Sequence, residues 1–310
     1  MNTFLKNMKR RQDGFTLLEL IVVIAILAII AGGLLVSYDG LEAKAAKGQA
    51  TFDIAAVDKG VRTFKVVGGA YPNEFDALLT DNATAANCAA GTSCSLTTGG
   101  FYAGLHNNLQ GTDGDLTTAD NKLGLYTLTA ADVTALNNAG ITQVRYIANA
   151  TNTVGNIPNR DFDDAPRGKG VLTTLIVGSV VPVVESEGLG AAAACTSPFS
   201  SPCNRLNDIT GLNPAIQHIV LALGVGNNSS IVSDATGGNS AGFAEAPFYT
   251  DVAKNQYGRY MALFHLASDT NDDGVIAAGE QFSTARFVGI LDPKGDWLDE
   301  EYAEFTGQKQ

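Results

Sequence analysis

The feature that most constrains this chain is an apolar run close to its N-terminus. Residues 15–36 read FTLLELIVVIAILAIIAGGLLV and contain one charged residue, Glu19. As a helix this run would rise about 33 Å, at ~1.5 Å per residue, which is enough to cross the hydrocarbon core of a membrane. Lys9, Arg10 and Arg11 precede the run, so the positive-inside rule places the N-terminus in the cytoplasm and the C-terminal bulk outside.

The residues that flank the run do not fit an ordinary secretory signal. Such a signal is cleaved after its apolar region, whereas polar, helix-favouring residues follow here. The block KRRQDG-FTLLEL instead resembles the leader of type IV prepilins: residues 1–14 form a short basic leader, Gly14 lies at the cut, and Phe15 becomes the new N-terminus. The resemblance implies that prepilin peptidase, a membrane-embedded aspartyl enzyme, cuts after Gly14 and methylates the amino group of Phe15.

Glu19 is an unusual residue to find in such a run. Placing an ionised carboxylate in a bilayer costs on the order of 3 kcal/mol, although a position near the cytoplasmic end reduces that cost. The resemblance implies what offsets it: the charged N-terminal amine of a neighbouring subunit, which is recruited during assembly. Glu19 is therefore the predicted assembly residue.

The helix is predicted to continue beyond residue 36 to about residue 66. Apolar side chains recur at helical spacing on one face: Ile54, Val57, Val61 and Phe64. Gly68-Gly69 and Pro72 then end the helix. The segment GAYPNEFDALL, residues 69–79, also resembles the helix-to-loop junction of type II secretion pseudopilins.

The rest of the chain predicts an α+β fold, in which the outer half of the long helix packs on an antiparallel β-sheet with disulfide-closed loops. We predict a globular domain over residues 67–310, outside the cytoplasm, with an insertion around residues 81–121. The pattern predicts strands over residues 143–149, 171–184, 259–267 and 282–291, and short helices over residues 129–139, capped by Thr129, and 213–223, opening at Pro214.

The four cysteines form two close pairs, Cys88 with Cys94 and Cys195 with Cys203, each inside a loop rich in small and polar residues. These spacings suit local disulfides in an oxidising compartment. A zinc site is the alternative, but no CxxC pattern occurs and the chain has 3 histidines. We therefore predict two disulfides.

Residues 269–280 read DTNDDGVIAAGE and fit the ~12-residue calcium-loop template. Oxygen-bearing side chains stand at alternate positions, and Gly274 permits the sharp turn. The predicted Ca²⁺ ligands are the side chains of Asp269, Asn271, Asp273 and Glu280 and the carbonyl of Val275. Pseudopilins that this chain resembles carry calcium in a C-terminal loop between strands, and a solvated acidic turn is the alternative.

Other polar motifs indicate less. Gly238–Gly242 matches the G-x-S-x-G pattern of serine hydrolases through Ser240, but a Gly/Asn/Ser run precedes it where a strand is needed. Asp113, Asp115 and Asp120 form a sparser acidic set that leaves a second metal site open. The acidic closing segment, residues 296–304, is most simply a solvated surface. The net charge of −12 argues against nucleic acid as a partner.

These observations predict a structural subunit of a type IV pilus-like filament, a pseudopilin of a type II secretion system, and not an enzyme. It would be anchored in the inner membrane before assembly. The predicted partners are copies of itself, other pilin-like subunits, prepilin peptidase and an inner-membrane assembly platform. The alternative is a minor tip subunit or adhesive pilin that binds a partner through its large loops. Pilins and pseudopilins share this N-terminal motif, so the motif does not distinguish a pilus subunit from a subunit of a secretion system.

Overall fold

The structure of the chain, a computed structural model, divides into two compact units, Met1–Ala45 and Ala46–Gln310. The residues that it describes are 16–80, 93–94, 101, 104–106, 109, 123–147, 170–184, 216, 218–232, 243–253, 256–271, 276–277 and 279–307. For residues 34–43 the backbone alone is described.

Helix α1 (Leu17–Gly68) is the first element, and its second half belongs to the second unit. Ile54, Val57 and Val61 are at most 2% exposed and belong to the same hydrophobic core as the strands. The helix ends at Gly68, and Gly69 follows with a φ of +75°, which glycine adopts at little cost. The helix predicted to reach about residue 66 is therefore confirmed.

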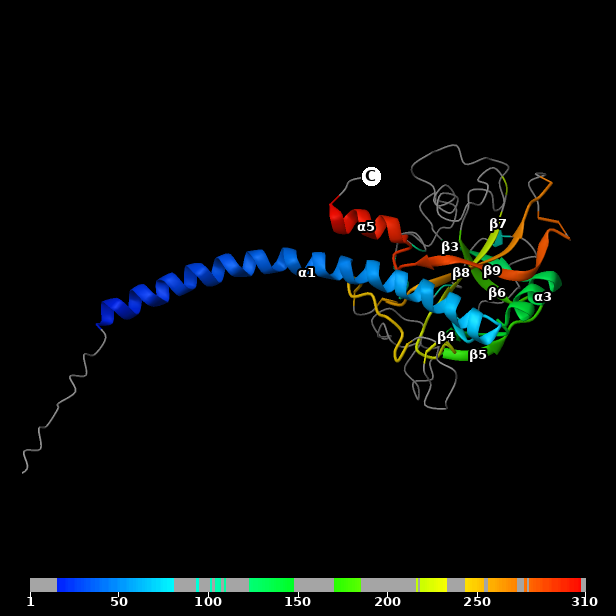
Figure 1. Cartoon of the computed structure of the whole chain (residues 1–310), viewed down its shortest axis with the longest axis horizontal. Coiled ribbons are helices and arrows are strands. Elements are labelled where there is room, and N and C mark those ends of the chain that lie inside the picture. The colour runs from blue at the N-terminus through cyan, green and yellow to red at the C-terminus, as the bar shows by residue number, and fades with distance from the viewer. Residues whose placement is uncertain are drawn as a thin grey trace, which may run out of the picture. The chain divides into compact units, whose positions relative to one another are not determined.

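Within the described residues, nine strands form one sheet (Figure 1). They are β1 (Phe75–Thr80), β2 (Ser93–Cys94), β3 (Leu123–Thr127), β4 (Gln143–Ile147), β5 (Gly170–Thr174), β6 (Val180–Val184), β7 (His218–Gly224), β8 (Met261–Ser268) and β9 (Gln281–Leu291). Their order is β2-β3-β6-β7-β1-β4-β5, and β7 also pairs with β8, which pairs with β9. A long helix on a sheet is the predicted α+β class.

The sheet is mixed, not antiparallel as predicted. Strands β1 and β4 pair in parallel, with Phe75 opposite Val144, whereas the other strand pairs are antiparallel. Parallel strands require a crossover connection, and the crossover between β1 and β4 contains helix α3 (Ala130–Ala139). Asn138 Nδ2 of α3 donates to the carbonyl oxygen of Ser283 on β9 at 2.8 Å, so α3 lies against that strand.

Most of the predicted elements after α1 are confirmed. The helix over residues 129–139 is α3, with Thr129 as its N-cap, and the segment 143–149 contains β4. Residues 171–184 form two strands, β5 and β6, and the two strands predicted near the C-terminus are β8 and β9.

Two elements differ from the prediction. The helix predicted over residues 213–223 is wrong, because His218–Gly224 form β7, which is buried along its whole length. A short, continuous apolar run fits a buried strand as well as a buried helix. Helix α5 (Leu298–Thr306) was not predicted, and it follows β9 after a tight turn.

Candidate functional site

Glu19 lies in the first turn of α1 and closes a capping box. Its Oε2 accepts hydrogen bonds from the backbone N of Thr16 at 2.8 Å and from Thr16 Oγ1 at 2.9 Å. The backbone N of Glu19 donates to Thr16 Oγ1 at 3.3 Å. This reciprocal pairing satisfies N–H groups that the start of a helix leaves without intrahelical partners. The sequence interpretation missed this local role, although the Thr-x-x-Glu spacing of residues 16–19 indicates it.

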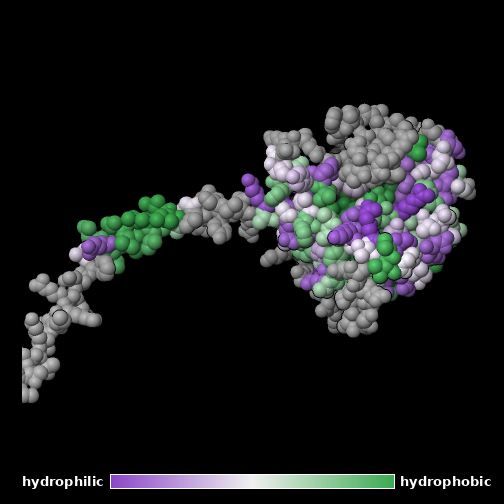
Figure 2. Space-filling model, in the orientation of Figure 1, coloured by the Kyte–Doolittle hydropathy of each residue, from purple (hydrophilic) through white to green (hydrophobic). Residues whose placement is uncertain are grey.

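The helix around Glu19 is apolar on all sides. From Leu17 to Ile30 every large apolar side chain is exposed, from 47% for Val22 to 77% for Leu17. Figure 2 shows these residues as a continuous hydrophobic band. A helix that is apolar all round needs a membrane or other helices to cover it.

The described part of the chain contains no helix that combines the length and apolar character needed to cross a membrane. The membrane-spanning role of residues 15–36 stays a prediction.

The predicted calcium loop joins β8 to β9, as the sequence analysis expects. Asp269 follows the last residue of β8 and is 1% exposed, and Glu280 directly precedes β9. Asn271 lies between them on the surface. Asp273 and Val275 lie outside the described residues, so the structure brings three of the five predicted ligands into one loop and does not place the other two.

Glu280 ties the two ends of this loop together. Its Oε1 accepts hydrogen bonds from the backbone N of Thr270 at 2.8 Å, from Thr270 Oγ1 at 2.9 Å and from the backbone N of Asn271 at 3.2 Å. Its Oε2 accepts from the backbone N of Ala277 at 2.8 Å. The Ala277 and Thr270 hydrogen bonds stabilise the ionised form and lower the pKa of Glu280. The loop is thus built around a carboxylate.

Two histidines and a serine meet beside this loop, a cluster that the sequence analysis did not predict. His218 Nδ1 lies 3.2 Å from His265 Nε2 and 2.9 Å from Ser268 Oγ, and Ser268 Oγ lies 3.0 Å from His265 Nε2. All three side chains are buried. Burial, and then the neighbouring His218, lower the pKa of His265 from 6.5 to about 4. The cluster keeps His265 neutral near pH 7.

Several predicted residues lie outside the described part of the chain: Gly14, Phe15, Cys88, Cys195, Cys203, Ser240, Asp113, Asp115 and Asp120. Cys94 lies in β2, where the structure describes its backbone. The two disulfides therefore stay predictions.

The closing acidic segment is the predicted solvated surface only in part: Asp299 and Glu304 are exposed, whereas Glu301 is buried. Glu301 of α5 is 1% exposed, and Asp292, at the end of β9, is 0% exposed. With the half-buried Asp296 they bring one carboxylate oxygen each to within 4.8 Å of one another. The sequence contains no signal for this cluster, because Glu301 is one of several acidic residues in α5, and its burial depends on contacts with distant residues.

Comparison with known proteins gives matches of two kinds. The model of the prokaryotic N-terminal methylation motif matches residues 9–35. Type II secretion system core protein G of Aeromonas hydrophila is 42% identical over 64 residues, which are 21% of this chain and 45% of the relative. The protein of the same name from Dickeya chrysanthemi is 42% identical over 65 residues, 21% of this chain and 42% of the relative. No solved structure matches the chain.

The chain thus spans less than half the length of either relative that it matches. The motif match contains the predicted cleavage position, Glu19 and all but the last residue of the apolar run, which are the residues on which the resemblance was predicted. The predicted resemblance to type IV pilin-like proteins, of the kind found in type II secretion pseudopilins, is therefore confirmed.

Proposed function

We propose that this chain is a structural subunit of a type IV pilus-like filament, a pseudopilin of a type II secretion system. The observation that carries the proposal is the N-terminal methylation motif at residues 9–35, which leads into an apolar helix with exposed side chains on every face. Such a helix is suited to two environments in turn, a bilayer before assembly and a bundle of identical helices afterwards.

The proposal assigns a step to each part of the N-terminus. Prepilin peptidase cuts after Gly14 and methylates Phe15, and the apolar run holds the subunit in the inner membrane, with residues 67–310 outside the cytoplasm. An assembly platform then passes subunits into the filament, where copies of this chain and other pilin-like subunits pack their helices together. The protein acts by polymerising and catalyses no reaction.

The first test is the processed N-terminus. We expect the protein extracted from cells with active prepilin peptidase to begin at a methylated Phe15, as measured by N-terminal sequencing and mass spectrometry. A Gly14→Val variant should keep Met1, because the larger side chain blocks the cut. Intact Met1 in the wild-type protein from such cells would contradict the proposal.

The alternative of a minor tip subunit gains no support from the comparisons. Both relatives are named core proteins of their secretion system. The copy number of the chain in purified filaments separates the two functions, since a tip subunit is present once in a filament and a core subunit throughout it.

We further propose that the loop of residues 269–280 binds one calcium ion, through Asp269, Asn271, Asp273, the Val275 carbonyl and Glu280. Support comes from the buried Asp269 at one end of the loop and from Glu280, which reaches across from the other end. Calcium prefers oxygen ligands at about 2.3–2.6 Å and tolerates irregular geometry, whereas magnesium demands a tighter octahedral shell. The ion would fix the connection between β8 and β9.

Calcium is therefore expected to raise the melting temperature of the full chain in detergent. Binding to the folded state alone contributes about 2.7 kcal/mol at a hundredfold excess over Kd, which corresponds to roughly 5–10 °C for a domain of this size. Magnesium should raise it less.

The matched variants for this test are Asp273→Ala and Asp272→Ala, which remove the same charge from adjacent positions. The predicted ligand is Asp273, so its variant should show a smaller rise with calcium, whereas Asp272→Ala should behave as the wild type. Equal rises in the two variants would make the loop a solvated turn.

A further inference from the structure

Asp292 directly follows strand β9 and organises the turn that leads to helix α5. Its Oδ1 accepts hydrogen bonds from the backbone N of Lys294 at 2.8 Å and of Asp296 at 2.7 Å, and its own backbone N donates to the Asp296 carbonyl at 3.0 Å. The second oxygen, Oδ2, is buried and has no hydrogen-bond partner. The turn thus uses one oxygen of this carboxylate, and the other oxygen is buried without a hydrogen bond.

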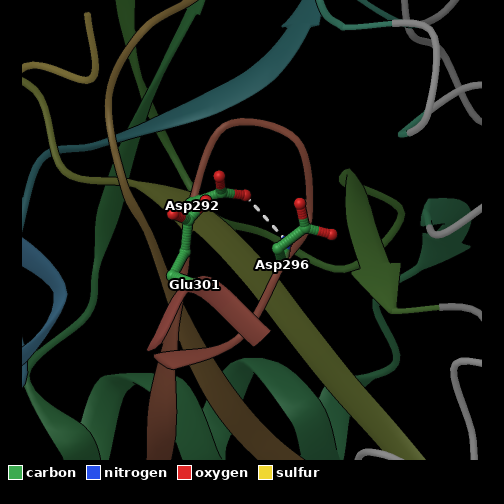
Figure 3. Close-up of side chains that lie close together, drawn as sticks. All are labelled: Asp292, Asp296 and Glu301. Atoms are coloured by element: carbon green, nitrogen blue, oxygen red, sulfur yellow. Dashed lines mark hydrogen bonds between the residues drawn. The ribbon is translucent and has the colours of Figure 1, made fainter. Parts of the chain in front are cut away.

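Glu301, in the first turn of α5, is in the same situation. Its Oε1 accepts a hydrogen bond from the hydroxyl of Tyr249 at 3.0 Å, while its Oε2 is buried and has no hydrogen-bond partner. Figure 3 shows the Glu301 and Asp292 side chains converging at the turn, with Asp296 across from them. The three residues offer ligand atoms that lie within 4.8 Å of one another.

Two buried carboxylates side by side are unstable without compensation. Burial, and then the neighbouring Asp296, raise the pKa of Asp292, and burial raises that of Glu301. The contact between the two carboxyl groups raises the pKa of Asp292 further and partly offsets the rise in the pKa of Glu301. The lysines nearby are engaged elsewhere: Lys294 Nζ lies 2.6 Å from Asp251 Oδ2, and Lys47 Nζ lies 2.6 Å from Glu304 Oε2. Buried charges in proteins are paired or coordinate metals, and within the described residues neither Asp292 nor Glu301 forms an ion pair.

We propose that Asp292, Asp296 and Glu301 bind a divalent cation of the calcium class, at a site separate from the loop of residues 269–280. The donors are all oxygens, which a hard cation prefers. One ion reaches all three, because the ligand atoms are no farther apart than 4.8 Å, about twice a typical calcium–oxygen distance of ~2.4 Å. Asp296 is half-buried, so water completes the shell from its side.

The position of the site defines what the ion would do. It joins the end of β9 to α5 and, through the Tyr249 hydroxyl, to the segment before β8. Helix α5 in turn contacts α1 within the second unit: Lys47 pairs with Glu304, and the ring of Phe305 packs where a side chain on Gly48 would stand. The cation would therefore hold the C-terminal helix against the long helix.

The single tryptophan of the chain allows a direct test, because Trp297 follows Asp296 immediately. Terbium is the probe, since it takes oxygen ligands as calcium does and emits when a nearby excited indole transfers energy to it. With the full chain in detergent and selective tryptophan excitation, we expect terbium emission that added calcium abolishes. Losing a direct ligand should weaken binding at least as much as losing a residue that orients one, about 10- to 100-fold.

Three variants decide the outcome. Glu301→Gln should weaken terbium binding by that factor, and Asp296→Asn, on the outer side of the site, provides the same test if Glu301→Gln does not fold. Asp273→Ala, in the other acidic loop, should leave the emission unchanged. Emission that is lost in Asp273→Ala and kept in Glu301→Gln would overturn the proposal.

Absence of emission from the wild type would overturn it as well. In that case Asp292 and Glu301 of the wild type share a proton instead of binding a cation. Glu301→Gln should then raise the melting temperature at neutral pH with chelator present, because its neutral amide needs no proton. None of these outcomes depends on cleavage, methylation or filament formation, so the failure of this proposal is distinguishable from failure of the proposed function.

Discussion

Replacing Glu19 by alanine is expected to remove this chain from filaments without lowering its amount in the membrane. The amount in the membrane should hold or rise, since the variant no longer places a carboxylate in the apolar run. If Glu19 pairs with the charged amine of a neighbouring subunit, as the resemblance implies, the variant leaves that amine without its buried partner, at a cost of about 3–5 kcal/mol. This cost is a hundredfold or more in the constant for incorporation, at about 1.4 kcal/mol per factor of ten. Immunoblots of sheared filaments and of membranes measure the two quantities.

Two further variants separate this role from the capping box that Glu19 forms with Thr16. Glu19→Gln keeps a side chain that can close the box but removes the charge, so we expect it to fail in assembly as Glu19→Ala does. Thr16→Ala keeps the charge and loses the cap, a change that costs roughly 0.5–2 kcal/mol of helix stability. If Thr16→Ala blocked assembly and Glu19→Gln did not, the capping box would be the function of Glu19.

The elements that could be predicted from the sequence are those whose signals are local. The end of α1 is encoded by Gly68-Gly69, and Gly69 does adopt a left-handed φ of +75°. The start of α3 is encoded by Thr129, whose Oγ1 accepts a hydrogen bond from the backbone N of Asp132 at 3.3 Å. In return, Asp132 Oδ2 accepts a hydrogen bond from the backbone N of Thr129 at 2.9 Å. A few adjacent residues suffice for both signals.

The pairing of strands depends on contacts between distant residues and could not be predicted. Pro182 lies within β6, opposite Leu125 of β3, although proline cannot donate to a sheet and favours strand edges and breaks. On its other side β6 pairs with β7 at one position, Val183 with Leu221, so the missing N–H group of proline is tolerated. The parallel pairing of β1 with β4 likewise requires the crossover through α3, and no short stretch of sequence indicates that these two strands pair.

The acidic residues show the same limit. The spacing of residues in the sequence was enough to predict Asp269 and Glu280 in one loop, and in the structure they lie at its two ends. Asp292 and Glu301 belong to different elements, and their meeting depends on the turn at Gly295, which has a φ of +83° and donates to the Asp292 carbonyl at 3.0 Å. In the sequence, Asp292 is only the residue after a strand and Glu301 is only one of several acidic residues in the closing segment, so neither indicates the other.

The second large effect concerns His265, which is expected to make the folded domain lose stability as the pH falls from about 6.5 to 4. The folded chain holds the pKa of His265 at about 4, against an ordinary value of 6.5. The unfolded chain therefore binds this proton first, and stability that is fully present above pH 6.5 is lost as the pH falls through that window. The loss approaches about 3 kcal/mol, at 1.36 kcal/mol for each pH unit between the two pKa values.

A His265→Gln variant isolates this effect, because glutamine can hydrogen-bond with Ser268 but does not titrate. The comparison is needed because Asp292 and Glu301 act in the opposite direction: their pKa values are raised in the folded state, so their contribution grows as the pH falls. The measurement is urea unfolding at pH 7, 5.5 and 4 of the full chain in detergent, with His106→Gln as the control. The free energy of unfolding of the wild type should fall relative to His265→Gln between pH 7 and 4, and should stay parallel to that of His106→Gln. A constant difference between the wild type and His265→Gln across this range would mean that His265 is protonated as easily in the fold as in water, and that burial beside His218 does not suppress its charge.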